Sequence, residues 1–217
     1  MAVSGSGNVA QYATQKLLEF GAKVITLSDS NGVLVFDDGL IKDDLEAVLE
    51  CKNVKRGRLS SLVDGAVSGR YIPGESPWSL KDVKYDLALP CATQNEITGE
   101  GAKLLVANGV LGVCEGANLP TTLEGQDVIR ANPDIIYLPG KASNAGGVGV
   151  SGFEMSQNAQ RLTWAPEEVD QRLQDMMASI YSQMEENAGE GGTLEQGANR
   201  AGFVKVATAM KELGWIY

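Results

Sequence analysis

A glycine-rich segment near the N-terminus carries the residue types that bind phosphate. Gly5, Gly7 and Ala10 match the spacing G-x-G-x-x-A. In this pattern the first glycine allows a sharp turn, the second lets the backbone approach a pyrophosphate, and the alanine lets a helix pack closely on its strand. Main-chain amides at the start of that helix then face the anion. The residues expected to form this phosphate-binding turn are Ser6, Gly7, Asn8 and Val9.

A second polar group, Ser28-Asp29-Ser30, follows the motif by about 20 residues. A carboxylate at this place binds the ribose hydroxyls of NAD, whereas hydroxyl groups suit the 2′-phosphate of NADP. A cluster of basic residues is interpreted in two ways, as a contact to the adenosine end of a cofactor or as a solvated helix terminus. It consists of Lys52, Lys55, Arg56 and Arg58. These residues alone leave the choice between NADP and NAD open.

The composition excludes several other kinds of site. The 217 residues include no histidine, which rules out Ser-His-Asp and Cys-His triads and histidine metal ligands. A net charge of −10 makes nucleic-acid and membrane-surface roles improbable on electrostatic grounds. The three cysteines, Cys51, Cys91 and Cys114, form no Cys-x-x-Cys pair and are expected to be reduced and mostly buried. We therefore expect a cytoplasmic protein without a metal site.

The elements that would position these residues alternate between strand and helix. We expect four strands (23–27, 86–89, 110–114, 135–138) and four helices (9–20, 43–51, 100–107, 121–131), with a small hairpin or loop at 33–36. Strands that alternate with helices predict βαβ units. The expected fold class is therefore α/β, a Rossmann-type doubly wound, mostly parallel sheet.

The last third of the chain has a different pattern. From about residue 143 the strands stop, and two amphipathic stretches at 167–186 and 193–213 predict helices that close the domain. At the other end, only four residues precede Gly5. Because the first strand of a doubly wound sheet is central, we expect most of that strand to be missing, which favours a fragment of a longer protein.

Three longer motifs each follow an expected strand, and they carry a resemblance. They are Pro90-Cys91-Ala92-Thr93-Gln94-Asn95-Glu96-Ile97, Glu115-Gly116-Ala117-Asn118-Leu119-Pro120-Thr121-Thr122 and Pro139-Gly140-Lys141-Ala142-Ser143-Asn144-Ala145-Gly146-Gly147-Val148, supported by segments at 150–158 and 196–207. With them the chain resembles the cofactor-binding half of the NADP-type glutamate dehydrogenases, within the Glu/Leu/Phe/Val amino-acid dehydrogenase family. The resemblance covers essentially residues 1–217, expected to be one NADP-binding Rossmann domain.

The resemblance implies roles for particular residues. Thr93, Gln94, Asn118 and Asn144 would lie near the nicotinamide ribose and carboxamide, and Val148 and Ser151 would line the glutamate side-chain end of the pocket. Because Ser28-Asp29-Ser30 resembles the pattern of NADP-using members, it also favours NADP over NAD. The implied reaction is the reversible oxidative deamination of L-glutamate to 2-oxoglutarate and ammonia.

The resemblance also implies what this chain would not do. The family's catalytic lysine and aspartate belong to an N-terminal substrate domain, so no catalytic residue is assigned here and Lys141 is not taken as a substitute. The chain is expected to bind cofactor but to be inactive alone, and full-length members are typically homo-hexamers. Two alternatives stay open: a free-standing dinucleotide-binding regulatory module, and an NAD-dependent dehydrogenase of another amino acid. An apolar stripe on the last helix is expected to be partly exposed: Phe203, Val206, Met210 and Leu213.

Overall fold

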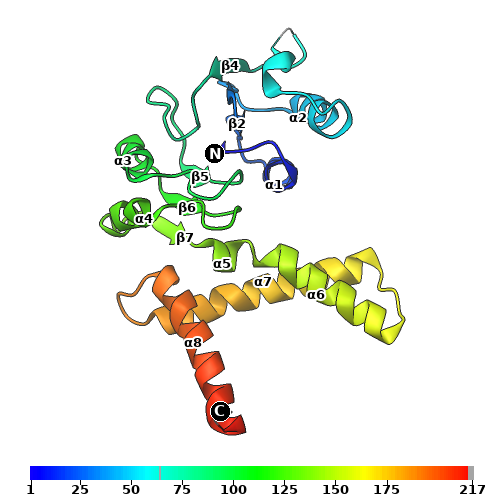
Figure 1. Ribbon diagram of the computed structural model, residues 1–217, viewed down its shortest axis with the longest axis vertical. Coiled ribbons are helices and arrows are strands. Elements are labelled where there is room, and N and C mark those ends of the chain that lie inside the picture. Colours follow the sequence, from blue (N-terminus) through cyan, green and yellow to red (C-terminus); the bar gives the residue numbers. More distant parts are fainter. Residues whose placement is uncertain (64, 215–217) are drawn as a thin grey trace. The chain divides into compact units, whose positions relative to one another are not determined.

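The computed structural model describes residues 1–63 and 65–214. The chain forms two compact units, the first from Met1 to Ile136 and the second from Tyr137 onward. The sheet has seven strands in the order β4-β3-β2-β1-β5-β6-β7 (Figure 1). Their bounds are β1 Ala2–Val3, β2 Thr26–Asp29, β3 Gly32–Val35, β4 Arg70–Pro73, β5 Leu87–Leu89, β6 Gly112–Cys114 and β7 Ile136–Leu138.

Strand β1 takes the central position although it is only two residues long. Ala2 pairs in parallel with Thr26 of β2 and with Ala88 of β5. The Thr26 hydroxyl accepts a hydrogen bond from the Val3 amide at 2.9 Å and donates to the Val3 carbonyl at 3.0 Å. Strand and side-chain bonds together thus hold both sides of the short strand, and the chain reaches the glycine turn from the middle of a parallel sheet.

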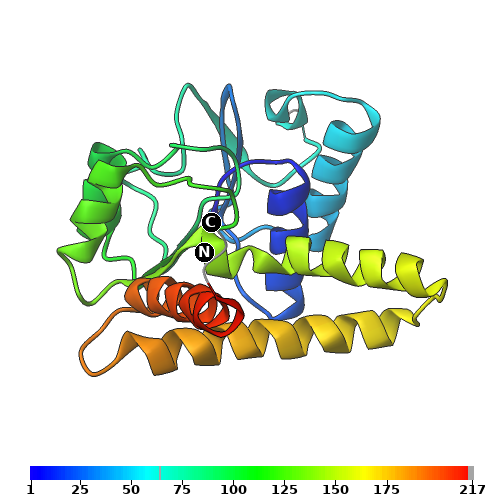
Figure 2. The same ribbon diagram turned by 60° about the horizontal axis from the view of Figure 1, so that its bottom comes forward.

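Helices cover both faces of the sheet in the first unit. Figure 2 shows α1 (Asn8–Glu19) and α2 (Lys42–Leu49) on one side, and α3 (Gly99–Asn108) and α4 (Leu123–Arg130) on the other. The core between the sheet and α1/α2 is built from buried apolar side chains, among them Val3, Ala10, Leu27, Leu34, Phe36, Leu45 and Val48. The expected α/β doubly wound, mostly parallel fold is confirmed.

Two details of the sheet differ from the expectation. The strand expected at 23–27 begins only at Thr26 and runs to Asp29. It then turns directly into β3, so that Asp29 lies opposite Gly32 in an antiparallel hairpin, and β4 adds a second antiparallel strand at the edge. Strand β4 escaped the sequence analysis because its sequence, Arg70-Tyr71-Ile72-Pro73, is half exposed and has no apolar run.

The chain after α2 continues into a rarer helical form. A π-helical turn, η1, spans Glu50–Val54, and a 3-10 turn, η2, spans Leu59–Leu62. Between them Arg56 adopts a positive φ of 53°, which ends the helical path. The basic residues of the sequence analysis therefore lie on η1 and on the sharply turned segment that follows it.

The described residues of the second unit form four helices. They are α5 Gly140–Ser143, α6 Ala145–Gln160, α7 Pro166–Ala188 and α8 Leu194–Leu213, with α7 packed against both α6 and α8 (Figure 1). The two long helices at 167–186 and 193–213 are confirmed within two residues. Helix α8 begins at a capping box, in which Thr193 and Gln196 exchange hydrogen bonds between side chain and main-chain amide. No helix in the described part of the chain is long and apolar enough to cross a membrane.

Candidate functional site

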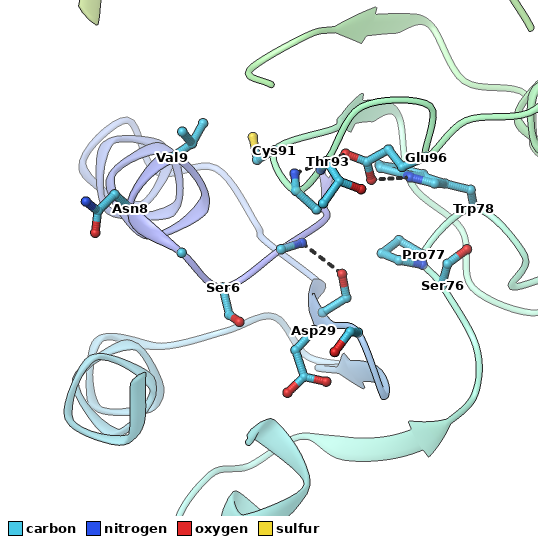
Figure 3. A pocket seen from close by; sticks show the side chains of 15 residues that line it. Ser6, Asn8, Val9, Asp29, Ser76, Pro77, Trp78, Cys91, Thr93 and Glu96 are labelled. Atoms are coloured by element: carbon cyan, nitrogen blue, oxygen red, sulfur yellow. Dashed lines mark hydrogen bonds between the residues drawn. The ribbon is translucent and has the colours of Figure 1, made fainter. Parts of the chain in front are cut away.

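A pocket of about 520 Å³ opens where β1, β2 and β5 end (Figure 3). Three segments at the ends of these strands line the pocket: the glycine turn after β1, the end of β2 and the loop after β5. A fourth wall comes from the connection between β4 and β5. The lining residues are Gly5, Ser6, Gly7, Asn8, Val9, Ser28, Asp29, Ser30, Ser76, Pro77, Trp78, Cys91, Ala92, Thr93 and Glu96. The carboxyl ends of parallel strands are where open α/β sheets bind ligands.

The glycine turn has the geometry that its sequence predicts. Gly5 has a φ of +84°, and a Cβ on it would stand 3.0 Å from the Cys91 carbonyl oxygen. The Gly5 amide donates to the Ser28 hydroxyl at 2.8 Å, which ties the turn to β2. Gly7, in contrast, has nothing within 4 Å of its Cβ position, while Ala10 is fully buried. The turn is thus rigid at Gly5, open at Gly7 and closely packed at Ala10.

The first turn of α1 is well suited to an anion. Its N-cap is Gly7, which offers no side chain to cap the helix, and no acidic residue stands in its first turn. The amides of a first helical turn have no partner within the helix, and the helix dipole places positive partial charge there. A phosphate beside Ser6–Val9 would satisfy those donors.

The end of β2 brings a carboxylate and two hydroxyls into the pocket wall. The two oxygens of Asp29 accept backbone amides of Asn31 and Leu59, both at 2.9 Å. The Ser30 hydroxyl accepts a hydrogen bond from the Arg58 guanidinium at 2.7 Å. Asp29 therefore holds the β2–β3 turn and the start of η2, and its negative charge is offset by amides. Partial burial and the charge of Asp29 raise the pKa of the Tyr71 hydroxyl.

The loop after β5 is held in shape by Glu96. One carboxylate oxygen accepts the amides of Ala92 and Thr93 at 3.0 and 3.2 Å, and the other accepts the Trp78 indole N–H at 2.8 Å (Figure 3). The buried Ser4 hydroxyl also accepts the Cys91 amide at 2.8 Å. Charge-assisted bonds of this kind fix Thr93 at the mouth of the pocket. Burial raises the pKa of the Cys91 thiol to about 12, and this side chain is buried, as expected.

The structure gathers most of the predicted site residues and separates the others. Eight of them line the pocket: Ser6, Gly7, Asn8, Val9, Ser28, Asp29, Ser30 and Thr93. Gln94 and Asn118 are exposed on the loops after β5 and β6, and an Asn95 amide to Leu119 carbonyl bond of 3.0 Å joins those loops. Neither side chain belongs to the pocket lining.

Three predicted residues lie in the second unit. Asn144 stands between α5 and α6, and Val148 and Ser151 are exposed one turn apart on α6. The Ser151 hydroxyl donates to the Gly147 carbonyl at 3.3 Å, a bond within the helix. Lys141 donates to the Asn199 side chain on α8. Their roles toward glutamate and the nicotinamide stay predictions.

Sequence reasoning missed part of the pocket. Ser76, Pro77 and Trp78 form one wall, and the bonds of Glu96 shape the opposite loop. The signal available was a tryptophan between a turn and an expected strand, which is more typical of a core residue than of a site. Trp78 is in fact only 2% exposed, so it is a core residue that also lines the pocket.

Fold and site together define a Rossmann-type doubly wound domain with a glycine-rich turn at the start of α1. The model of the Glutamate/Leucine/Phenylalanine/Valine dehydrogenase family matches residues 1–214, and the chain belongs to this family. It is 50% identical to the NADP-specific glutamate dehydrogenase of Escherichia coli K12, over 100% of this chain and 48% of that protein. Identity to the NADP-specific glutamate dehydrogenase of Giardia intestinalis is 48%, over 99% and 48% of the two chains.

A solved structure gives the same result. The glutamate dehydrogenase of Plasmodium falciparum superposes with a TM-score of 0.92 at 45% identity, over 99% of this chain and 46% of that one. The chain therefore spans about half the length of the relatives it matches.

Proposed function

We propose that this chain is the NADP(H)-binding half of a glutamate dehydrogenase. The observation that carries the proposal is the single pocket in which the glycine turn, the Ser28–Ser30 segment and the Thr93 loop meet at the carboxyl ends of three adjacent strands. A dinucleotide has three parts that need these three walls: a pyrophosphate, an adenosine ribose and a nicotinamide ribose. The NADP-specific relatives from Escherichia coli and Giardia intestinalis support the same cofactor.

The pyrophosphate would bind at the glycine turn. Because Gly7 is open to the pocket, the backbone offers its first-turn amides without a side chain in the way. These amides and the α1 dipole would hold the anion. The residues in this role are Ser6, Gly7, Asn8 and Val9.

The 2′-phosphate would bind at the end of β2. Ser28, Ser30 and the guanidinium of Arg58 are the donors available there, and Arg58 already contacts Ser30. Both Asp29 oxygens are occupied by backbone amides, so this carboxylate repels a phosphate less than a free one would. This arrangement favours NADP over NAD because the end of β2 offers the hydroxyls of Ser28 and Ser30 and the Arg58 guanidinium to a 2′-phosphate.

The proposed reaction is the oxidative deamination of L-glutamate, for which the bound cofactor supplies hydride transfer at its nicotinamide ring. This chain would orient the cofactor through the fixed Thr93 loop, with Gln94, Asn118 and Asn144 at the nicotinamide end. Val148 and Ser151 would contact the glutamate side chain. The catalytic lysine and aspartate would come from the half of its relatives that this chain does not span, so the chain alone would bind cofactor without turnover. Cys51, Cys91 and Cys114 form no disulfide, which would fit a reducing cytoplasm.

The test is a fluorescence titration of the purified chain with NADPH and, separately, with NADH. Saturable binding with a preference for NADPH is the expected result. A preference for NADH would overturn the 2′-phosphate site and make Asp29 a ribose ligand. No binding of either cofactor to a chain that is folded by circular dichroism would overturn the proposed function.

A further inference from the structure

A buried glutamine joins the phosphate-binding turn to the basic segment on η1. Gln11, on the second turn of α1, is only 4% exposed. Its amide nitrogen donates to the Ser6 carbonyl at 2.8 Å and to the Asn53 side-chain oxygen at 3.1 Å. Asn53 returns a hydrogen bond to the Gln11 oxygen at 3.0 Å. The two amides therefore form a reciprocal pair between elements that are 42 residues apart.

The basic segment is closed on itself by hydrogen bonds within it. The Gly57 amide donates to the Cys51 carbonyl at 2.8 Å, and the Lys52 ammonium donates to the Gly57 carbonyl at 3.0 Å. The Lys55 amide donates to the Glu50 carbonyl at 3.0 Å. These bonds close a compact loop that contains Asn53 and ends next to Arg58.

The same loop is attached to the pocket at its other end. Arg58 donates to the Ser30 hydroxyl, and the next residue, Leu59, donates its amide to Asp29. The loop thus spans from α1 to the end of β2, with the Gln11–Asn53 pair at one attachment and Ser30–Asp29 at the other. π-Helical turns often occur at functional sites, and here the π turn carries Asn53.

We propose that Gln11 and Asn53 are a positioning pair for cofactor selectivity. The pair sets how far Arg58 stands from the phosphate-binding turn, and so presents its guanidinium to a 2′-phosphate before the cofactor arrives. Donors that are held in place in the free protein need no ordering upon binding. Because NADPH differs from NADH only by the 2′-phosphate, an effect of Asn53 that acts through Arg58 weakens NADPH binding and leaves NADH binding nearly unchanged. This inference rests on the proposed function.

The test compares the variant Asn53→Ala with wild type by NADPH and NADH titration. Asn53 is exposed, so its truncation leaves no core cavity. We expect NADPH binding to weaken about fivefold, because Arg58 loses its preset position, and NADH binding to change less than about twofold. Asn158→Ala, on exposed α6, is the matched control and is expected to change neither affinity. If Asn53 has only a structural role, Asn53→Ala would instead weaken the binding of NADPH and NADH by the same factor.

A double-mutant cycle decides whether Asn53 acts through Arg58. In an Arg58→Ala background, Asn53→Ala is expected to cause no further loss of NADPH affinity, because the group it positions is gone. If wild type prefers NADPH, two outcomes would overturn the positioning role. One is that the losses of NADPH affinity from Asn53→Ala and Arg58→Ala add up, and the other is that Asn53→Ala leaves the ratio of NADPH to NADH affinity unchanged. A wild-type chain without that preference would instead overturn the proposed function.

Discussion

At the scale of single residues, the two glycines of the glycine-rich turn before α1 have separable roles. Gly5 has a positive φ and a close backbone neighbour, whereas Gly7 has ordinary φ and open space around it. Gly7→Ala should therefore leave the free energy of unfolding nearly unchanged but weaken NADPH and NADH alike, by about tenfold or more, because its methyl group occupies the pyrophosphate position. Urea unfolding and cofactor titration measure the two effects.

Gly5→Ala provides the contrast. It places a methyl group against the Cys91 carbonyl and forces a non-glycine residue to a φ of +84°, so it should destabilise the first unit by about 1 kcal/mol or more. If Gly7→Ala instead lowers the free energy of unfolding but leaves the cofactor affinity of the folded chain unchanged, the pyrophosphate does not lie at Gly7.

Residue types in a strict spacing were what the sequence could reveal about the site. The glycine turn, Ser28–Ser30 and Thr93 were found because their motifs follow strands, and strand ends meet at one edge of a parallel sheet. Trp78 and the Gln11–Asn53 pair were missed as site elements because their contacts join segments without a shared motif. Glu96 lies within the Pro90–Ile97 motif, but nothing in the sequence indicates that its carboxylate holds the loop. Such contacts depend on side-chain reach in the folded chain, which spacing along a sequence does not contain.

At the scale of elements, helices α1–α4, α7 and α8 and the parallel strands were predictable, because apolar periodicity and glycine stops both mark them. Helix α6 was not among the expected helices. The antiparallel edge strand β4 and the π turn were not. An edge strand buries little and needs no apolar run, and a π turn differs from an α-helix only in its hydrogen-bond register. Strand β1 shows the opposite case: two residues suffice because both neighbours and the Thr26 hydroxyl hold it.

The packing of α7 against α8 depends on one glycine. A Cβ at Gly197 would overlap the Met184 carbonyl oxygen and would lie 3.0 Å from the Ala188 nitrogen, both backbone atoms of α7. Gly197→Ala should therefore force the helices apart and destabilise the second unit by about 2 kcal/mol or more. Thermal unfolding followed by circular dichroism measures this loss.

A second glycine of α8 supplies the matched control. Gly202 has nothing within 4 Å of its Cβ position, so Gly202→Ala should stabilise the helix by roughly 0.5–1 kcal/mol through reduced backbone entropy of the unfolded chain. Equal effects of the two substitutions would mean that helix propensity, and not the α7–α8 approach, decides the stability of this unit.

At the scale of the whole molecule, two buried side chains that can lose a proton predict how the free energy of unfolding falls at high pH. Burial raises the pKa of both the Cys91 thiol and the Tyr85 hydroxyl to about 12, from ordinary values of 9.0 and 10.0. Above those ordinary values the unfolded chain releases protons that the folded chain retains. The stabilising contribution is thus complete below about pH 9 and is lost as the pH rises toward 12, by up to about 1.4 kcal/mol per pH unit for each group.

Urea midpoints measured from pH 8 to pH 11 would show this decline. Between pH 9 and 10 the slope comes mainly from the thiol, so Cys91→Ala should flatten it there, whatever the variant's stability at pH 8. Tyr85→Phe should flatten the slope above pH 10, while Tyr181→Phe, at an exposed tyrosine, should not. If neither Cys91→Ala nor Tyr85→Phe alters the slope of stability against pH, these two groups do not cause the loss of stability at high pH.

The face of α8 that carries exposed apolar side chains leads to a prediction about the chain in solution. Phe203, Val206, Met210 and Leu213 are spaced along one face of α8 and are 74%, 60%, 42% and 79% exposed, as the sequence led us to expect. A contiguous apolar stripe of this kind favours contact with another surface. The chain should therefore self-associate as its concentration rises, which sedimentation measures. It should also bind an environment-sensitive apolar dye, which fluorescence measures. Phe203→Lys with Val206→Lys should abolish both, whereas Glu195→Lys, on the same helix outside the stripe, should not. A monodisperse, dye-silent wild-type monomer would show that other parts of the chain cover this face in solution.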